Sequence, residues 1–358
     1  MKQISIIGTV GVPACYGGFE SLVENLLDYT PEDVQYTVFC TAKKYEQKLD
    51  SYKGAKLVYL EKNANGKDSI LYDFESMKKS LDSDIMLVLG VSGCAFLPYI
   101  RKRFKGKIIT NIDGLEWRRD KWKWYAKKIL KFSESRAVKY SDIVIGDNKG
   151  ITDYVKEEYG KDAVLIAYGG DHVEKIVDDS LYNDYPFCKE PYAVTVCRIE
   201  PENNIHAILE AFSENPNMPL VIVGNWEKSE YGKNLKEKYS TFDNIHILDS
   251  IYDAHRINWI RGNAALYVHG HSAGGTNPSL VEAMNFGLPI LAFDCVYNRA
   301  TTEEKALYWK DSEGLSELLK KVGADKAEME SIGFAMKEAG KRLYSWEKIA
   351  EQYNNLWK

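Results

Sequence analysis

The sequence predicts an α/β protein built from two doubly wound, Rossmann-like domains. Short runs rich in β-branched residues alternate with helical stretches along the whole chain, as in parallel sheets covered by helices. A glycine-containing loop follows a predicted strand in each half. With 358 residues, the chain is also too long for one typical hydrophobic core.

The predicted strands are short apolar runs between polar or glycine residues. In the first half they span residues 4–7, 35–40, 56–60, 85–89, 107–111, 143–145 and 164–166. In the second half they span residues 193–197, 220–223, 245–248, 265–269, 290–293 and 307–309. The polar segment 178–191 shows no clear periodicity and is the expected linker.

The chain is expected to end in a helix that begins after an N-cap at Ser345. One face of this helix carries its apolar side chains, Trp346, Ile349, Tyr353 and Leu356. We expect an N-terminal domain over residues 1–180, a C-terminal domain over 181–340, and a C-terminal helix over 341–358 that packs back toward the N-terminal domain. If the two sheets face each other, the carboxyl ends of their strands line a central cleft for ligands.

The composition is that of a soluble globular protein, with 45% hydrophobic and 28% charged residues. The six cysteines include no C-x-x-C pair, and several lie in apolar runs, which favours reduced, buried thiols in a cytosolic protein. The first eight residues predict a buried strand and not a signal peptide. The longest uncharged stretch, residues 85–100, is shorter than the roughly 20 residues of a membrane span.

Positive charge is concentrated in residues 101–131, which hold twelve Lys or Arg and three Asp or Glu, although the chain has a net charge of −5. Basic residues in and beside this segment alternate with aromatic ones, namely Trp117, Trp122, Trp124, Tyr125 and Phe132. A helix that mixes the two kinds suits an anionic membrane surface. The alternative is a solvated helix whose aromatic side chains face the core. Nucleic acid is not favoured as a partner, because the rest of the chain is acidic and carries no nucleic-acid-binding motif.

The segment 274–290 carries the most informative pattern in the chain. Two glycines follow a predicted strand, Asn277 is placed to cap the next helix, and Pro278 fits its first turn. The N-terminus of such a helix can bind phosphate through its N–H groups and dipole. Glu282 offers a carboxylate further along, where a sugar hydroxyl would lie. The pattern suggests a nucleoside diphosphate ligand; the alternative is an ordinary strand–loop–helix unit with a well-capped helix.

The first half carries its loop over residues 8–18, between the opening strand and a helical run. This loop does not have the G-x-G-x-x-G pattern, and no acidic residue stands where a dinucleotide ribose would need one. A dinucleotide-dependent dehydrogenase is therefore not favoured.

The two loops together resemble a known family. The motif P-A-x-Y-G-G-F-E over residues 13–20, paired with G-G-T-N-P-S-L-V-E-A-M over residues 274–284, is similar to retaining glycosyltransferases of family 4. Within that family the chain most resembles bacterial rhamnosyltransferases of capsule and cell-wall polysaccharide assembly. The resemblance covers essentially the whole chain. It implies the GT-B fold, with two Rossmann-like domains facing a central cleft.

The resemblance also implies roles for individual residues in donor binding. Arg198 matches an arginine that contacts the donor diphosphate, but Asn203 stands where the family has a lysine. Glu282 matches a glutamate on the nucleotide ribose, whereas the family's other glutamate would fall at Gly274. Backbone amides would then hold the sugar. The expected donor-binding set is Gly17, Gly18, Arg198, His271, Gly274, Gly275, Thr276, Asn277 and Glu282.

Other candidate residues follow predicted strands of the first half. Asp113, Asp147 and Tyr168 are expected at the cleft edge, and with Arg198 they form the catalytic set. Their alternative roles are helix capping for Asp113 and turn formation for Asp147 and Tyr168. The expected membrane or acceptor set is Glu116, Trp117, Arg118, Arg119, Lys121, Trp122, Lys123 and Trp124.

A retaining transfer of this kind, as the resemblance implies, needs no protein nucleophile, because the departing phosphate oxygen can take the acceptor proton. No metal or other cofactor is expected, and the nucleotide sugar is a co-substrate. The D-x-D pattern at Asp82 and Asp84 lies before a predicted strand and not after one. His269 and His271 lack a third ligand at metal spacing, so shaping of the sugar pocket or plain packing is favoured for them.

Three functions of different classes are consistent with these patterns. The first is transfer of L-rhamnose from dTDP-L-rhamnose to an undecaprenyl-diphosphate-linked saccharide, by a cytoplasmic enzyme bound peripherally to the inner face of the plasma membrane. The second is a nucleotide-sugar epimerase of the same fold. The third is a noncatalytic nucleotide-sugar-binding subunit. The basic aromatic segment favours the first over the second, and Arg198 with Glu282 argues against the third.

Overall fold

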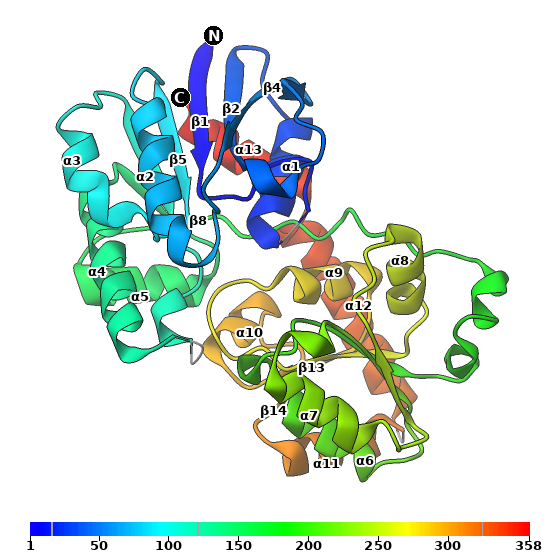
Figure 1. The fold of residues 1–358 in the computed structure, drawn as a ribbon. Helices are drawn as coiled ribbons and strands as arrows, with labels where there is room; N and C mark the ends of the chain where they lie inside the picture. The colour runs from blue at the N-terminus through cyan, green and yellow to red at the C-terminus, as the bar shows by residue number, and fades with distance from the viewer. Residues whose placement is uncertain (16, 120–121, 324) are drawn as a thin grey trace. The chain divides into compact units, whose positions relative to one another are not determined.

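The computed structural model describes residues 1–15, 17–119, 122–323 and 325–358, which form two compact units (Figure 1). The first unit comprises Met1–Tyr168 and Trp346–Lys358, and the second comprises Gly169–Ser345. Each unit is a predominantly parallel sheet with helices packed on it. The predicted fold class, α/β with two Rossmann-like sheets, is confirmed.

In the first unit, the described strands pair in the order β3-β4-β2-β1-β5-β6-β7-β8. Their bounds are β1 (Lys2–Ile7), β2 (Val34–Thr41), β3 (Ser51–Tyr52), β4 (Ala55–Leu60), β5 (Ile85–Leu89), β6 (Lys107–Asn111), β7 (Ile143–Gly146) and β8 (Val164–Leu165). All pairs are parallel except β3 with β4. The strand order changes direction between β1 and β5, so the loops after these two strands flank a topological switch point.

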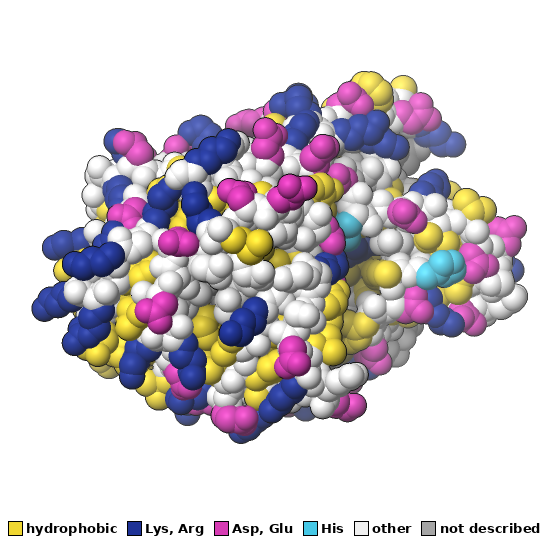
Figure 2. Space-filling view, turned by 90° about the horizontal axis from the view of Figure 1, so that it is seen from above, with side chains coloured by type: hydrophobic (Ala, Val, Ile, Leu, Met, Phe, Trp, Pro, Cys, Tyr) yellow, Lys and Arg dark blue, Asp and Glu magenta, His cyan; other side chains and the backbone are white. Residues whose placement is uncertain are grey.

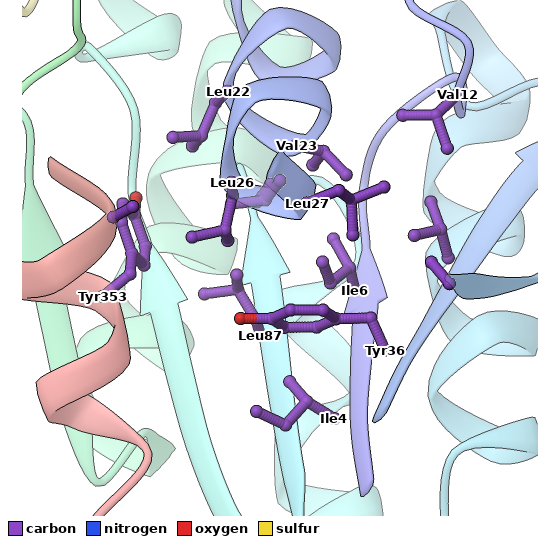
Figure 3. Close-up of a cluster of buried hydrophobic side chains, with 14 of the residues drawn as sticks. Ile4, Ile6, Val12, Leu22, Val23, Leu26, Leu27, Tyr36, Leu87 and Tyr353 are labelled. Carbon is purple, nitrogen blue, oxygen red and sulfur yellow. The ribbon is translucent and has the colours of Figure 1, made fainter. Parts of the chain in front are cut away.

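The core of the first unit lies between the sheet and the helices α1 and α13 (Figure 3). Leu22, Val23, Leu26 and Leu27 recur on one face of α1 and are buried against Ile4 and other strand side chains. The helix α13 buries the predicted apolar face through Trp346, Ile349 and Tyr353. The helices of this unit are α1 (Gly18–Asp28), α2 (Ser69–Lys79), α3 (Leu97–Arg101), α4 (Trp124–Tyr140), α5 (Lys149–Tyr159) and α13 (Trp346–Leu356).

In the second unit, the described strands pair in the order β11-β10-β9-β12-β13-β14, all parallel. Their bounds are β9 (Ala193–Val196), β10 (Leu220–Val223), β11 (Ile245–Leu248), β12 (Leu266–His269), β13 (Ile290–Phe293) and β14 (Leu307–Trp309). The helices are α6 (Ile205–Ser213), α7 (Glu230–Tyr239), α8 (Ala254–Gly262), α9 (Pro278–Phe286), α10 (Val296–Thr301), α11 (Ser312–Val322) and α12 (Lys326–Leu343). In chain order the sheet runs third, second, first, fourth, fifth, sixth, which is the Rossmann order, and its switch point lies between β9 and β12.

The segment expected to be a linker is ordered. It forms two 3₁₀ turns, Asp179–Tyr182 and Pro186–Lys189, inside the second unit. The rings of Tyr182 and Tyr185 lie 5.0 Å and 6.1 Å from the ring of Trp259 on α8. The first segment of the first unit runs to Tyr168, whereas the sequence suggested a boundary at residue 180. Aromatic packing that joins residues far apart in the sequence orders a segment with no internal periodicity.

Two further expectations concern the membrane and the cysteines. Among the described residues, no helix has the length and apolarity needed to cross a bilayer. All six cysteines are free thiols. Cys40, Cys94 and Cys188 are buried, whereas Cys15 is exposed and Cys197 and Cys295 are partly exposed.

Candidate functional site

The site in the second unit lies at the switch point of its sheet. The loop after β9 carries Arg198 and Asn203, and the loop after β12 carries His271 and leads to Asn277. These two strands are neighbours, so both loops leave the same edge of the sheet at its carboxyl end. Ligands of open α/β sheets bind at this position.

Three successive residues of each loop hold the two loops together. The Ser272 N–H donates to the Glu202 carbonyl at 2.9 Å, and the Asn204 Nδ2 donates to the Gly270 carbonyl at 2.8 Å. Between these bonds, His271 Nδ1 lies 2.8 Å from Asn203 Oδ1. A Cβ at Gly270 would lie 2.0 Å from the Asn203 carbonyl oxygen, so only glycine fits this close approach. The loops therefore form one structural element.

Arg198 presents its guanidinium at the surface of this element. Its side chain is 45% exposed, and Nη1 lies 3.8 Å from an oxygen of Glu200. Lys228, from the turn after β10, lies 3.8 Å from the other Glu200 oxygen. Two cations thus stand at this edge of the sheet. Asn203, at the position of the family's lysine, is instead buried and donates to the Arg198 carbonyl at 2.7 Å.

The glycine loop delivers the N-terminus of α9 to the same edge. Gly274 and Gly275 have φ angles of 71° and 43°, which a side chain would disfavour. Asn277 caps α9 as predicted, because its Oδ1 accepts from the Ser279 N–H at 3.1 Å and from the Ser279 hydroxyl at 2.8 Å. Thr276 is buried beside this cap. The capped helix start supplies N–H groups and a positive dipole end.

Glu282, one turn further along α9, is held by two side chains that the sequence patterns did not indicate. Arg261, from α8, lies 2.6 Å from one carboxylate oxygen, and both side chains are about nine-tenths buried. His172 Nε2 lies 3.3 Å from the other oxygen. Burial alone would raise the pKa of Glu282, but Arg261 and then His172 lower it below its ordinary value. Glu282 is therefore ionised at neutral pH, with its charge compensated.

In the first unit, a buried carboxylate organises the loop after β1. Glu20 accepts from the Thr9 hydroxyl at 2.8 Å and from the Val10 N–H at 2.6 Å. Burial raises the pKa of Glu20. Gly17, with a φ of 65°, precedes α1, which starts at Gly18 without a side-chain cap. The structure places Gly17 and Gly18 at a helix start, and it adds Glu20 as the residue that shapes their loop.

Asp113, Asp147 and Tyr168 follow the neighbouring strands β6, β7 and β8. Burial raises the pKa of Tyr168 well above its ordinary value, and the nearby charges of Asp113 and then Asp147 raise it further. Asp113 has a φ of 60°, and its N–H donates to Asn111 Oδ1 at 3.0 Å. It does not cap α4, because that helix begins at Trp124 after Lys123. The structure brings these three predicted residues together, while Arg198 belongs to the second unit.

Four residues of the expected membrane set, Glu116, Trp117, Arg119 and Trp122, are only partly exposed and bond within the first unit. The Trp117 indole N–H donates to buried Glu134 at 2.9 Å, and the Trp122 indole N–H donates to Glu116 at 2.9 Å. Arg119 pairs with Glu116 at 3.0 Å, and the Arg118 guanidinium lies 5.1 Å from the Trp117 ring. These residues precede α4, so the expected single mixed helix starts later than the sequence pattern suggested. Lys121 lies outside the described residues.

The exposed apolar surface belongs to α4 itself. Trp124 is 70% exposed, and about half of the side-chain surface of Tyr125, Ile129 and Phe132 is exposed. Lys123 is also exposed, and Lys128 Nζ lies 5.0 Å from the Trp124 ring. Lys and Arg side chains gather with hydrophobic ones between them at the left of Figure 2, on the side where α3 lies in Figure 1. We call Lys123, Trp124, Tyr125, Lys127, Lys128, Ile129 and Phe132 the α4 face.

His269 and the D-x-D pattern lie in packed or structural positions. Burial lowers the pKa of His269 to about 3, and its ring stacks 5.9 Å from the ring of Tyr267. Asp84 accepts from the Gln3 N–H at 2.8 Å, away from the carboxyl end of the sheet. Within the described ranges, no three His, Cys, Asp or Glu side chains gather as a metal site would require.

Most of the second unit matches the model of a known protein family. Residues 184–338 match the family model described as glycosyl transferases group 1. The chain contains a group 1 glycosyltransferase domain. Residues 1–171 match a second model, described as a domain of unknown function, DUF1972. A search of curated proteins gave no match.

Several solved structures share the fold of this chain. Sucrose-phosphate synthase from Thermosynechococcus elongatus has a TM-score of 0.81 at 18% identity, with 100% of this chain and 98% of that chain covered. HepE from Anabaena, solved with UDP-glucose, has a TM-score of 0.78 at 13% identity, with 99% of each chain covered. A Listeria monocytogenes protein named for UDP-N-acetylglucosamine 2-epimerase activity has a TM-score of 0.63 at 15% identity, with 98% and 94% covered. These similarities establish the GT-B fold, which transferases and epimerases share.

Proposed function

We propose that this group 1 glycosyltransferase transfers a deoxysugar, L-rhamnose from dTDP-L-rhamnose, to a lipid-diphosphate-linked saccharide in capsule or cell-wall assembly. The observation that carries the proposal is the pairing of exposed Arg198 with the capped start of α9 at one switch point. Both features bind anionic groups, so they suit the diphosphate of a nucleotide sugar. The choice of rhamnose and of the lipid carrier rests on the resemblance of the two loop motifs.

The proposed chemistry needs only positioning and charge stabilisation from the protein. The bond between the anomeric carbon and the diphosphate oxygen breaks, and the acceptor oxygen forms a new bond to that carbon. The departing phosphate oxygen takes the proton of the acceptor hydroxyl on the same face of the sugar, and the nucleoside diphosphate leaves. Arg198 and the N–H groups of α9 stabilise the negative charge that develops on the diphosphate. No resident cofactor takes part in this scheme.

The proposed donor specificity follows from Glu282 and Gly274. Arg261 contacts one oxygen of the Glu282 carboxylate and His172 contacts the other. The remaining lone pairs are proposed to accept from the one free sugar hydroxyl of the deoxynucleoside. Gly274 offers no carboxylate where related enzymes hold the transferred sugar, so backbone amides of the glycine loop bind a sugar with fewer hydroxyls. In the first unit, Asp113, Asp147 and Tyr168 are proposed to bind the acceptor or the transferred sugar.

We further propose that the α4 face binds the anionic inner surface of the plasma membrane. Reversing Lys123, Lys127 and Lys128 to Glu should weaken binding to phosphatidylglycerol vesicles, because each cation near such a surface contributes about 1 kcal/mol. The expected loss in vesicle sedimentation is about 100-fold, or about 3 kcal/mol. A variant with Lys320, Lys321 and Lys326 changed to Glu has the same net charge and is the control, since these residues are exposed in the second unit. Equal binding of both variants would refute the proposal.

A transfer assay with several donors tests the function. Purified protein would receive dTDP-L-rhamnose, UDP-glucose, UDP-N-acetylglucosamine or GDP-mannose, each with a lipid-diphosphate-linked N-acetylglucosamine acceptor. Product from dTDP-L-rhamnose alone is the expected result. Product from another donor would correct the sugar but keep the transferase. Release of an epimerised nucleotide sugar would favour the epimerase, and nucleotide binding without turnover would favour the noncatalytic subunit.

A further inference from the structure

Asn203 links Arg198, on which the proposed donor site depends, to His271 of the neighbouring loop. Its Nδ2 donates to the Arg198 carbonyl at 2.7 Å, and its Oδ1 lies 2.8 Å from His271 Nδ1. The side chains of Asn203 and His271 are both more than nine-tenths buried. The backbone around them is fixed by the bonds between the two loops and by Asn298 Nδ2, which donates to the His271 carbonyl at 2.8 Å.

The chemistry of the three groups decides where the hydrogens lie. A backbone carbonyl can only accept, so the amide nitrogen of Asn203 must face Arg198. The amide oxygen then faces His271, and because that oxygen also can only accept, Nδ1 of His271 must carry a hydrogen. The Arg198 carbonyl thus determines the orientation of the Asn203 amide. The orientation of the amide in turn determines the tautomer of His271.

We propose that Asn203 is a positioning residue that fixes the Nδ1–H form of His271 while it holds the backbone of Arg198. In the neutral ring, Nε2 is then an acceptor. The part that this pair plays in donor binding rests on the proposed function; the tautomer itself does not. Asn203, which stands where the family has a lysine, therefore holds Arg198 and His271 in place in this chain.

The tautomer can be measured without any substrate. Long-range ¹H–¹⁵N spectra distinguish Nδ1–H from Nε2–H, and the chain has six histidines. The signals of His271 are those lost in His271→Gln. At pH 8, well above the ordinary histidine pKa of about 6.5, His271 should give the Nδ1–H pattern. An Nε2–H pattern in the unmodified protein would overturn the proposal, whatever the variants do.

Two substitutions separate the two tasks of Asn203. In Asn203→Ala both bonds are lost, so His271 should shift toward the Nε2–H form. In Asn203→Asp one carboxylate oxygen can still accept from Nδ1–H, but the other cannot donate to the Arg198 carbonyl. His271 should then keep its tautomer while kcat/KM for the donor falls about tenfold, as expected for one lost hydrogen bond. An unchanged tautomer in Asn203→Ala would contradict the proposal.

Asn215→Ala is the matched control. Asn215 also makes two side-chain bonds in the second unit, from its Nδ2 to the Ala211 carbonyl and to the Ser316 hydroxyl, each at 2.7 Å. It should lower stability without changing the His271 spectrum or the donor KM. If the spectra agree with the proposal and no donor is turned over, the proposed function fails and the tautomer assignment stands. If transfer occurs but His271 shows Nε2–H, the assignment fails alone.

Discussion

Replacing Arg198 with alanine is expected to lower the kcat of sugar transfer by about 10²–10³-fold, the usual effect of removing one donor from a developing anion. The guanidinium stands at the switch point beside the start of α9, where the diphosphate charge would grow as the sugar departs. Its side chain is 45% exposed, and its ion pair with Glu200 is long, at 3.8 Å, so the fold should tolerate the change. Single-turnover kinetics and the thermal unfolding midpoint measure the two effects separately.

The control for this substitution is Arg256→Ala. Arg256 is 44% exposed in the same unit and pairs with Asp184 at 3.0 Å, so the substitution removes an equally exposed arginine away from the switch point. It should leave kcat within about twofold of the unmodified enzyme, as a surface change remote from the site does. Arg198→Lys should recover part of the lost rate, because it restores the charge but not the planar fork. Near-normal turnover by Arg198→Ala would exclude the role in diphosphate binding.

Most strands were predictable because they lie buried in a mostly parallel sheet and therefore appear as short apolar runs. The run at residues 220–223 matches β10 residue for residue. The two-residue strand β3 was missed, since Ser51 and Tyr52 are too few to show a period. Trp117 and Trp122 were counted with a helix because they alternate with basic residues. Their positions are set instead by Glu134 and Glu116, which accept their indole hydrogens.

The site could be predicted only where its geometry is local in sequence. The Asn277 cap involves residues two apart, so its pattern is visible in the chain. Arg261 and His172 reach Glu282 from distant segments, and no spacing rule connects them. Asn203 could be recognised as a missing lysine, but its bonds to Arg198 and His271 depend on how two loops meet. The sequence did not reveal these side-chain contacts, because the topology of the fold brings the partners together from distant segments.

Breaking the Arg261–Glu282 pair by changing only one partner should strongly destabilise the second unit. Both side chains are about nine-tenths buried, and the two atoms lie 2.6 Å apart. Arg261→Met would leave the carboxylate buried with only His172 nearby, which is expected to lower the free energy of unfolding by about 3–5 kcal/mol. The double change Arg261→Met with Glu282→Leu should restore much of this loss, because no unpaired charge is then buried. Urea unfolding of the three variants measures these differences.

The pH dependence of that loss tests its cause. Burial alone would raise the pKa of Glu282, but Arg261 and then His172 lower it. The ion pair therefore stabilises the fold at any pH above the ordinary carboxyl pKa. This stabilisation is lost as the pH falls through the lowered pKa of Glu282. Without Arg261, the strongest interaction that lowers the pKa of Glu282 is lost, so the carboxyl should become protonated at a higher pH. The deficit of Arg261→Met should therefore shrink as the pH is lowered from 7 toward 4. Lys233→Met, which breaks an exposed pair with Glu230, should leave the urea unfolding midpoint almost unchanged at either pH. A deficit that is equally large at pH 4 and pH 7 would show that Arg261 acts through its packing and not through its charge.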